Sequence, residues 1–273
     1  MRYAHCVFYR QQVLFRRNLS QQGHRMDYWN LALLFGVGSI AGFINVNAGG
    51  GSSLTLPTLI FMGLEGALAN GTNRVAIFIQ NIFAVASFRK NKMHQFKTST
   101  ELSLLTLPGA ILGAILAVRI SSVVFERILG GVLIFIVISL FFSRSYKERE
   151  PDQQEQKNWL IYPALLGIGF YGGFLQVGVG FLFMAALYHL LKVDLVTVNM
   201  HKVFIILIYT LPALLIFLLS GNINWKYGLA LAAGNAFGGW WGAHVAVKGG
   251  AKVIRIILAV AIIIMALKLF GLF

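Results

Sequence analysis

Long apolar stretches separated by short polar ones dominate the chain. Each half of the sequence holds five such stretches, and a charged stretch at residues 143–158 divides the halves. Because a helix needs about 20 apolar residues to cross a bilayer, this pattern predicts an all-α integral membrane protein with about 8–10 transmembrane segments. The expected segments are residues 29–47, 52–64, 68–88, 101–118 and 122–142, then 159–177, 179–191, 195–219, 225–246 and 251–272.

Two of these segments, 52–64 and 179–191, are too short to be straight spans. We expect them to be half-helices or re-entrant segments. The order long, short, long, long, long occurs in each half. It predicts two homologous membrane repeats, residues 28–142 and 159–273, joined by a polar linker loop at residues 143–158.

Matches between individual residues support the repeat. Small residues spaced by four recur at equivalent places in the two halves, and this spacing lets membrane helices approach closely. Glycines are common in membrane helices, which explains any single match but not an ordered set. The matched stretches are 42–46 with 173–177, 72–75 with 200–203, and 109–113 with 234–238.

Composition and charge agree with a membrane protein. Hydrophobic residues make up 58% of the 273 residues and charged residues 12%, with a formal net charge of +14. The basic residues lie in short stretches between apolar runs, so we expect the lipid bilayer as a partner and no nucleic acid. Cys6 is the only cysteine, which excludes an internal disulfide and a cysteine metal cluster.

Loop charges predict the orientation of the chain. If every segment crosses, the basic loops 89–97, 144–157 and 248–255 fall on one side, which the positive-inside rule makes cytoplasmic. This predicts inverted repeats in a cell (inner or cytoplasmic) membrane, with the amino end outside. Translation starting at Met26 would fit that orientation. If the basic tail at residues 1–27 is instead translated and cytoplasmic, the short segments are re-entrant and eight helices span.

Glycines interrupt the apolar pattern where both short segments begin. Gly49, Gly50 and Gly51 would each cost a helix about 1 kcal/mol relative to alanine, so we expect the chain to unwind there. A helix that resumes at Ser52 would present its positive end to an anion. The alternative is a plain loop with Ser52 as helix cap. The second half repeats the feature at residues 176–180.

Two basic residues, Arg74 and Lys202, lie where apolar runs begin, and neither has a carboxylate close to it in the sequence. A charge at membrane depth is costly unless it faces a cavity or an opposite charge, so a substrate anion is the predicted counter-charge. The alternative is that both side chains snorkel to the interface. His201 is a candidate for proton coupling or a neutral residue hydrogen-bonded inside the bundle. The predicted substrate-binding residues are Asn45, Asn47, Gly49, Gly50, Gly51, Ser52, Thr72, Asn73, Arg74, Gln176, Gly178, His201 and Lys202.

The sequence lacks the signatures of common enzymes. It has no phosphate-binding loop with its lysine, no pair of acids placed for acid–base work, and no histidine pair with metal-ligand spacing on a helix. We therefore expect no catalytic residues, no metal and no organic cofactor.

The order of the motifs resembles the TauE/SafE family of sulfite-exporter-like membrane permeases. The glycine-rich turn, a Leu-Pro pair, a Gly-Thr pair and the basic loop follow one another, and a degenerate second copy comes after. The resemblance covers nearly all of residues 29–272 and implies a transporter of sulfite, organosulfonates or related small organic acids. Asn47, Asn73, Arg74 and His201 depart from the family pattern. By resemblance, the family's motif positions are Gly49, Gly50, Gly51, Pro57, Gly71, Thr72 and Lys202.

These patterns together favour a secondary transporter (permease) for a small anion such as sulfite, an organosulfonate or a related organic acid. The alternative is a non-transporting membrane assembly or maturation factor. A scaffold of that kind would have no reason to retain unwound backbone and buried charge at membrane depth. Assembly as a homo-oligomer is compatible with the sequence.

Overall fold

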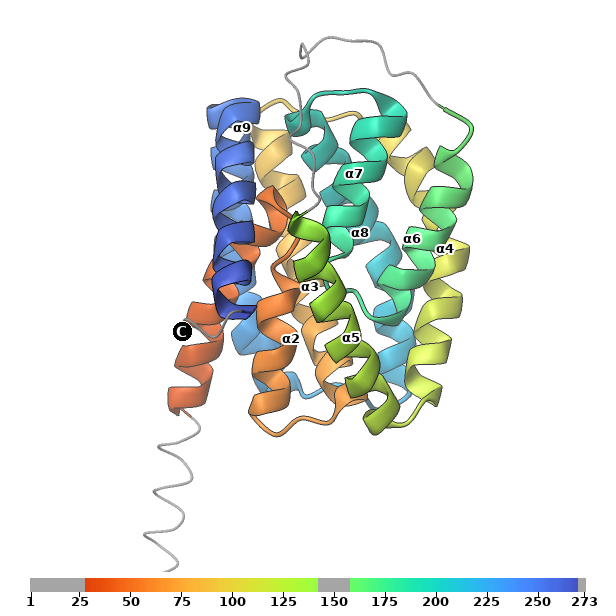
Figure 1. Ribbon diagram of the computed structural model, residues 1–273, viewed down its shortest axis with the longest axis vertical. Coiled ribbons are helices and arrows are strands. Elements are labelled where there is room, and N and C mark those ends of the chain that lie inside the picture. Colours follow the sequence, from red (N-terminus) through yellow and green to blue (C-terminus); the bar gives the residue numbers. More distant parts are fainter. Residues whose placement is uncertain (1–27, 142–157, 270–273) are drawn as a thin grey trace, which may run out of the picture.

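The described residues of the computed structural model, 28–141 and 158–269, form a bundle of helices without strands (Figure 1). The two expected short segments are separate helices, as predicted. In chain order the helices are Tyr28–Asn47, α2 (Ser52–Phe61), α3 (Gly66–Lys90), α4 (Phe96–Arg119), α5 (Ser122–Phe141), α6 (Ile161–Phe174), α7 (Val179–Leu191), α8 (Leu195–Leu219) and α9 (Trp225–Leu269).

Several boundaries differ from those expected. Helix α6 has only 14 residues, because the chain already unwinds at Leu175, ahead of the glycines. Helix α4 begins at Phe96, five residues earlier than its apolar run, since the polar residues that precede the run continue the helix. Helix α9 contains the expected segment 225–246 and the described part of the expected segment 251–272, which are separated by a kink at Gly250 with φ 60° and ψ −164°.

The helix breaks lie inside the bundle. Gly49 (φ 90°), Gln176 (φ 65°) and Gly178 (φ 68°) adopt left-handed backbone at these breaks, a conformation that glycine adopts without strain. Figure 1 shows both breaks near mid-height, with α2 running from its break to one end of the bundle and α7 running to the other end. Opposite directions of this kind are what an inverted repeat requires, although the inversion itself stays a prediction.

The matched glycine-containing stretches, 109–113 and 234–238, each pack against the first helix of the other half. Gly109 and Gly113 of α4 lie so close to α6 that a Cβ on either would sit 2.1 Å from a backbone oxygen. Gly234 and Gly238 of α9 are equally close to the helix Tyr28–Asn47, at 2.1 and 2.0 Å. Backbone approach of this kind is typical of small residues at membrane helix interfaces. The matched glycine runs therefore hold the two halves together.

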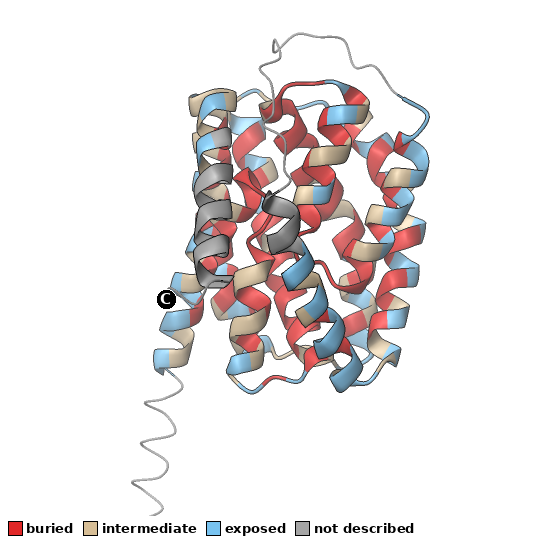
Figure 2. Ribbon diagram, viewed as in Figure 1, coloured by how far each residue is buried: buried red, intermediate tan, exposed pale blue. Residues whose placement is uncertain are grey.

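Burial is concentrated along the centre of the bundle (Figure 2). Many large apolar side chains are exposed on its outside. Leu112, Phe135, Leu215 and Phe237 are among these exposed residues. Contiguous apolar surface of this kind marks a contact with lipid or protein. Among the described helices, Tyr28–Asn47, α4 and α8 are each long and apolar enough to cross a membrane.

Candidate functional site

The two helix breaks meet at the centre of the molecule. A Cβ built on Gly49 would lie 2.3 Å from the carbonyl carbon of Gly180, and one built on Gly180 would lie 2.2 Å from the Cα of Gly49. Both distances are far below a van der Waals contact. The unwound segment of the first half therefore touches, through its backbone, the first turn of α7, directly after the second break. This explains why the sequence has glycine at both positions.

Lys202, the eighth residue of α8, reaches into the break of the first half. Its side chain is fully buried, and its Nζ donates hydrogen bonds to the carbonyls of Asn45 (3.2 Å) and Val46 (2.6 Å) and to Asn199 Oδ1 (2.7 Å). The carbonyls belong to the last turn of the helix Tyr28–Asn47. The C-terminal end of a helix carries partial negative charge and unpaired carbonyls, so it attracts a cation.

Arg74 of α3 makes the reciprocal contact. Its guanidinium donates to the carbonyls of Gly172 (3.2 Å) and Gly173 in the last turn of α6, and its Cζ lies 4.7 Å from the centre of the Phe217 ring. The Nε of Arg74 is buried without a hydrogen-bond partner. Each half thus sends one fully buried cation to the broken helix of the other half.

Neither cation has a carboxylate partner within the described residues. Asp194 is the one buried acid there, and it caps α8 by accepting hydrogen bonds from the backbone N–H groups of Val196 and Thr197. The alternative that Arg74 and Lys202 snorkel to the interface is wrong, because both side chains are completely buried. Backbone carbonyls supply only partial negative charge, so neither basic side chain is fully compensated by its hydrogen-bond partners.

Buried amides surround the two breaks. Asn45 Nδ2 donates to Gln80 Oε1 (3.2 Å), and Asn47 Nδ2 donates to the carbonyl of Gly242 (3.1 Å). Asn73 Oδ1 accepts a hydrogen bond from Thr55 of α2 (2.7 Å). The sequence-predicted residues Asn45, Asn47 and Asn73 therefore lie where the breaks are, together with Lys202.

Other predicted residues have local roles in this conformation. The N-cap of α2 is Gly51 rather than Ser52, and the backbone N–H groups of Ser53, Leu54 and Thr55 bond to the carbonyls of Gly50 and Gly51. Thr72 is buried, and its hydroxyl accepts from the backbone N–H of Asn224 (2.9 Å) just before α9. In this conformation, few donors at the start of α2 remain for an anion.

In the second half, Gln176 Nε2 donates to Thr210 (3.3 Å), while its Oε1 has no partner. Gly178 is the N-cap of α7. The fully buried His201 has its Nδ1 2.8 Å from the hydroxyl of Ser99 on α4. This contact agrees with a histidine hydrogen-bonded inside the bundle; proton coupling stays a prediction.

Several buried polar atoms at the centre have no partner. Buried polar groups are nearly always hydrogen-bonded, so unpaired ones mark places for a ligand or water. Gln80 and Tyr209 belong to this set but were not predicted as site residues. Helical spacing could have indicated both, because Gln80 lies seven residues after Asn73 and Tyr209 seven after Lys202. The unpaired donor atoms are Asn73 Nδ2, Arg74 Nε, Gln80 Nε2 and Tyr209 Oη.

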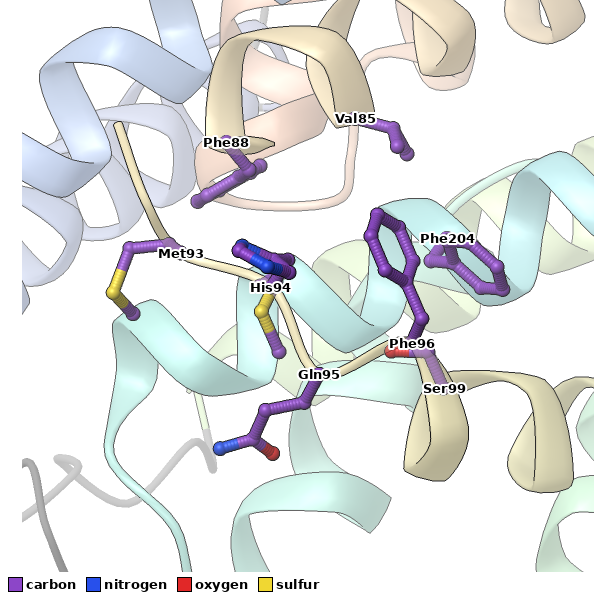
Figure 3. A pocket seen from close by; sticks show the side chains of 9 residues that line it. Val85, Phe88, Met93, His94, Gln95, Phe96, Ser99 and Phe204 are labelled. Atoms are coloured by element: carbon purple, nitrogen blue, oxygen red, sulfur yellow. The ribbon is translucent and has the colours of Figure 1, made fainter. Parts of the chain in front are cut away.

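A small cavity approaches this centre from the loop between α3 and α4. It has a volume of about 10 Å³, roughly the space that one water molecule needs. Figure 3 shows His94 and Gln95 on the loop side and Ser99 at the start of α4. Since Ser99 is the partner of His201, this cavity adjoins the buried polar residues from the end of the molecule that bears the basic loop.

The family model described as sulfite exporter TauE/SafE matches residues 34–269. The chain belongs to the TauE/SafE family. A protein of Sinorhizobium sp, named probable membrane transporter protein ORF9, is 30% identical over 241 residues, which is 88% of this chain and 92% of that protein. Probable membrane transporter protein YfcA of Escherichia coli K12 is 29% identical, with 88% of this chain and 89% of that protein covered. No solved structure matches the chain.

Membership of the TauE/SafE family agrees with the expected resemblance. These relatives are named probable membrane transporter proteins, which supports an integral membrane protein. The matched range contains both helix breaks and both buried cations. These features therefore lie within the part of the chain that defines the family.

Proposed function

We propose that this chain is a secondary transporter that carries a small anion across the cytoplasmic membrane, which it crosses several times. The observation that carries the proposal is the pair of fully buried cations, Arg74 and Lys202, which have only carbonyls and an amide as partners. Two uncompensated charges in a membrane protein are costly, and an anion between them would offset that cost. Sulfite, an organosulfonate or a small organic acid has the required charge and size.

The cation contacts also suggest how transport would occur. Each cation crosses from one half to the broken helix of the other, so these hydrogen bonds hold the halves together. An arriving anion competes with the carbonyls for the same donors. When the anion takes their place, one half is free to move against the other, which is the usual motion of a transporter built from two repeats.

The experiment is a thermal-unfolding screen of the detergent-purified protein with sulfite, sulfate, thiosulfate, sulfoacetate, taurine and simple carboxylates. Ligand binding raises the apparent stability by RT ln(1 + [L]/Kd). We expect one class of anion to stabilise the protein and Lys202→Ala to remove that stabilisation. The matched control is Lys248→Ala, which removes an exposed positive charge and should keep the stabilisation.

Two outcomes would contradict the proposal. If no anion stabilises the wild-type protein or enters proteoliposomes that contain it, the buried cations are structural and the assembly-factor alternative gains weight. If Lys202→Ala remains folded and keeps the full stabilisation, the anion binds at another site.

A further inference from the structure

A groove on the outer surface runs between the end of α3, the start of α4 and α8. It has a volume of about 520 Å³. Its floor and walls are apolar and include Ile82 and Ala86 of α3, Phe96 of α4 and Leu207 of α8. The same groove ends at two exposed cations, Arg89 and Lys90, in the last turn of α3.

The groove lies at the depth of a lipid molecule in a leaflet. Helix α3 has 25 residues, which corresponds to roughly 37 Å, against about 30 Å for the hydrocarbon core. A helix of this length that crosses the bilayer has its last residues at the membrane surface, which is where we expect the end of α3. Ile82 is seven residues before Arg89, or roughly 10 Å deeper along the helix. The apolar part thus faces acyl chains and the basic part faces headgroups.

The charged side chains that line the groove, Arg89 and Lys90, are both basic. Among the described residues, no acidic one lines the groove. Lys92 in the loop that follows α3 and Lys97 in the first turn of α4 are both exposed. The Nζ of Lys90 lies 5.5 Å from the centre of the Trp240 ring. A cation–aromatic contact of this kind holds the ammonium at a defined place, and tryptophan favours the interface between membrane and water. The end of the groove therefore carries two basic residues, of which Lys90 is held beside Trp240 of the neighbouring helix α9.

We propose that this groove binds an anionic phospholipid. The headgroup phosphate bonds to Arg89 and Lys90, and one acyl chain lies along Ile82, Ala86 and Leu207. Basic residues at the cytoplasmic ends of membrane helices attract anionic lipids, and an apolar groove beneath them adds contacts that the headgroup alone does not make. The inference does not depend on the nature of the transported solute.

The lipid site shares a wall with the small inner cavity. Val85 and Phe96 line both the groove and that cavity. Figure 3 shows Phe96 pointing from the start of α4 toward the region of Val85 on α3. A bound acyl chain would rest on the outer side of this wall, while Ser99, the partner of His201, lies on the inner side.

The test is native mass spectrometry of the detergent-purified full chain, titrated with phosphatidylglycerol and with phosphatidylcholine of the same acyl chains. We expect tighter retention of phosphatidylglycerol. Arg89→Gln and Lys90→Gln should each weaken it by about fivefold, from the usual contribution of one basic residue near an anionic surface. Ala86→Trp should also weaken it, because the indole fills the groove while both charges remain.

The matched control is Lys248→Gln with Lys252→Gln, which removes two exposed charges outside the groove. It should leave phosphatidylglycerol binding unchanged. Equal retention of the two lipids by the wild type would overturn the proposal, as would an equal loss in the control pair or full binding by Ala86→Trp. Displacement of the lipid by inorganic phosphate would show an anion site without an acyl-chain groove, and would also overturn it.

Discussion

Arg74 and Lys202 occupy equivalent positions in the two repeats, but they differ in how many of their hydrogen-bond donors have a partner. An ammonium has three donors, and Lys202 uses all of them on Asn45, Val46 and Asn199. A guanidinium has five, and the Nε of Arg74 has no partner. An anion can therefore meet Arg74 without first breaking a hydrogen bond, whereas Lys202 must release one. We infer that Arg74 makes the first contact with the solute.

Arg74→Lys tests this order of contacts. The change keeps one positive charge but removes Nε and the planar fork that bonds to the carbonyls of Gly172 and Gly173. We expect the affinity for the stabilising anion to fall by about tenfold, the usual effect of losing one charge-assisted hydrogen bond. The measurement is the anion concentration dependence of thermal unfolding. An unchanged Kd in a folded Arg74→Lys protein would contradict the role of Nε, and Arg89→Lys, at an exposed arginine, is the control.

At the scale of elements, the contact between the two helix breaks depends on the absence of side chains. Gly180 has no unusual φ, so an alanine there is disfavoured only by the contact with Gly49. Gly167 of α6 is also helical, but a Cβ added to it meets nothing within 4 Å. Alanine substitutions at Gly180 and at Gly167 therefore distinguish the effect of close packing from the effect of helix propensity.

We expect Gly180→Ala to lower the free energy of unfolding by about 1–3 kcal/mol, because the added methyl group pushes the two breaks apart. Gly167→Ala should leave stability unchanged or raise it by up to about 1 kcal/mol, since alanine favours helix over glycine. Thermal unfolding in one detergent measures both. Equal effects of the two substitutions would mean that the breaks do not touch in the purified protein.

Much of the helix pattern could be predicted, because apolar length and glycine breaks are local signals. The start of α4 and the end of α6 were misplaced, since polar residues can continue a helix beyond its apolar run and a helix can unwind before a glycine. The candidate site was predicted only in part. Lys202 was identified, but its carbonyl partners could not be, because they belong to the other half and only tertiary packing brings them to it.

At the scale of the whole molecule, the basic loop between α3 and α4 lies at one end of the bundle. Figure 1 shows the loop between α3 and α4 at the opposite end of the bundle from the loop between α4 and α5. The first loop and the start of α4 carry exposed Lys92 and Lys97. The positive-inside rule places that end in the cytoplasm, so Ser121, in the second loop, is expected outside the cell.

Single cysteines can test this orientation in a Cys6→Ser background, because the chain has no other cysteine. We expect a membrane-impermeant maleimide to label Ser121→Cys in intact cells and to label Lys97→Cys only after the membrane is opened. Both positions are exposed, so accessibility within the protein does not limit labelling. The reverse pattern would invert the orientation. Labelling of both cysteines in intact cells would mean that α4 does not cross the membrane. The predicted inversion of one repeat relative to the other would then be wrong as well.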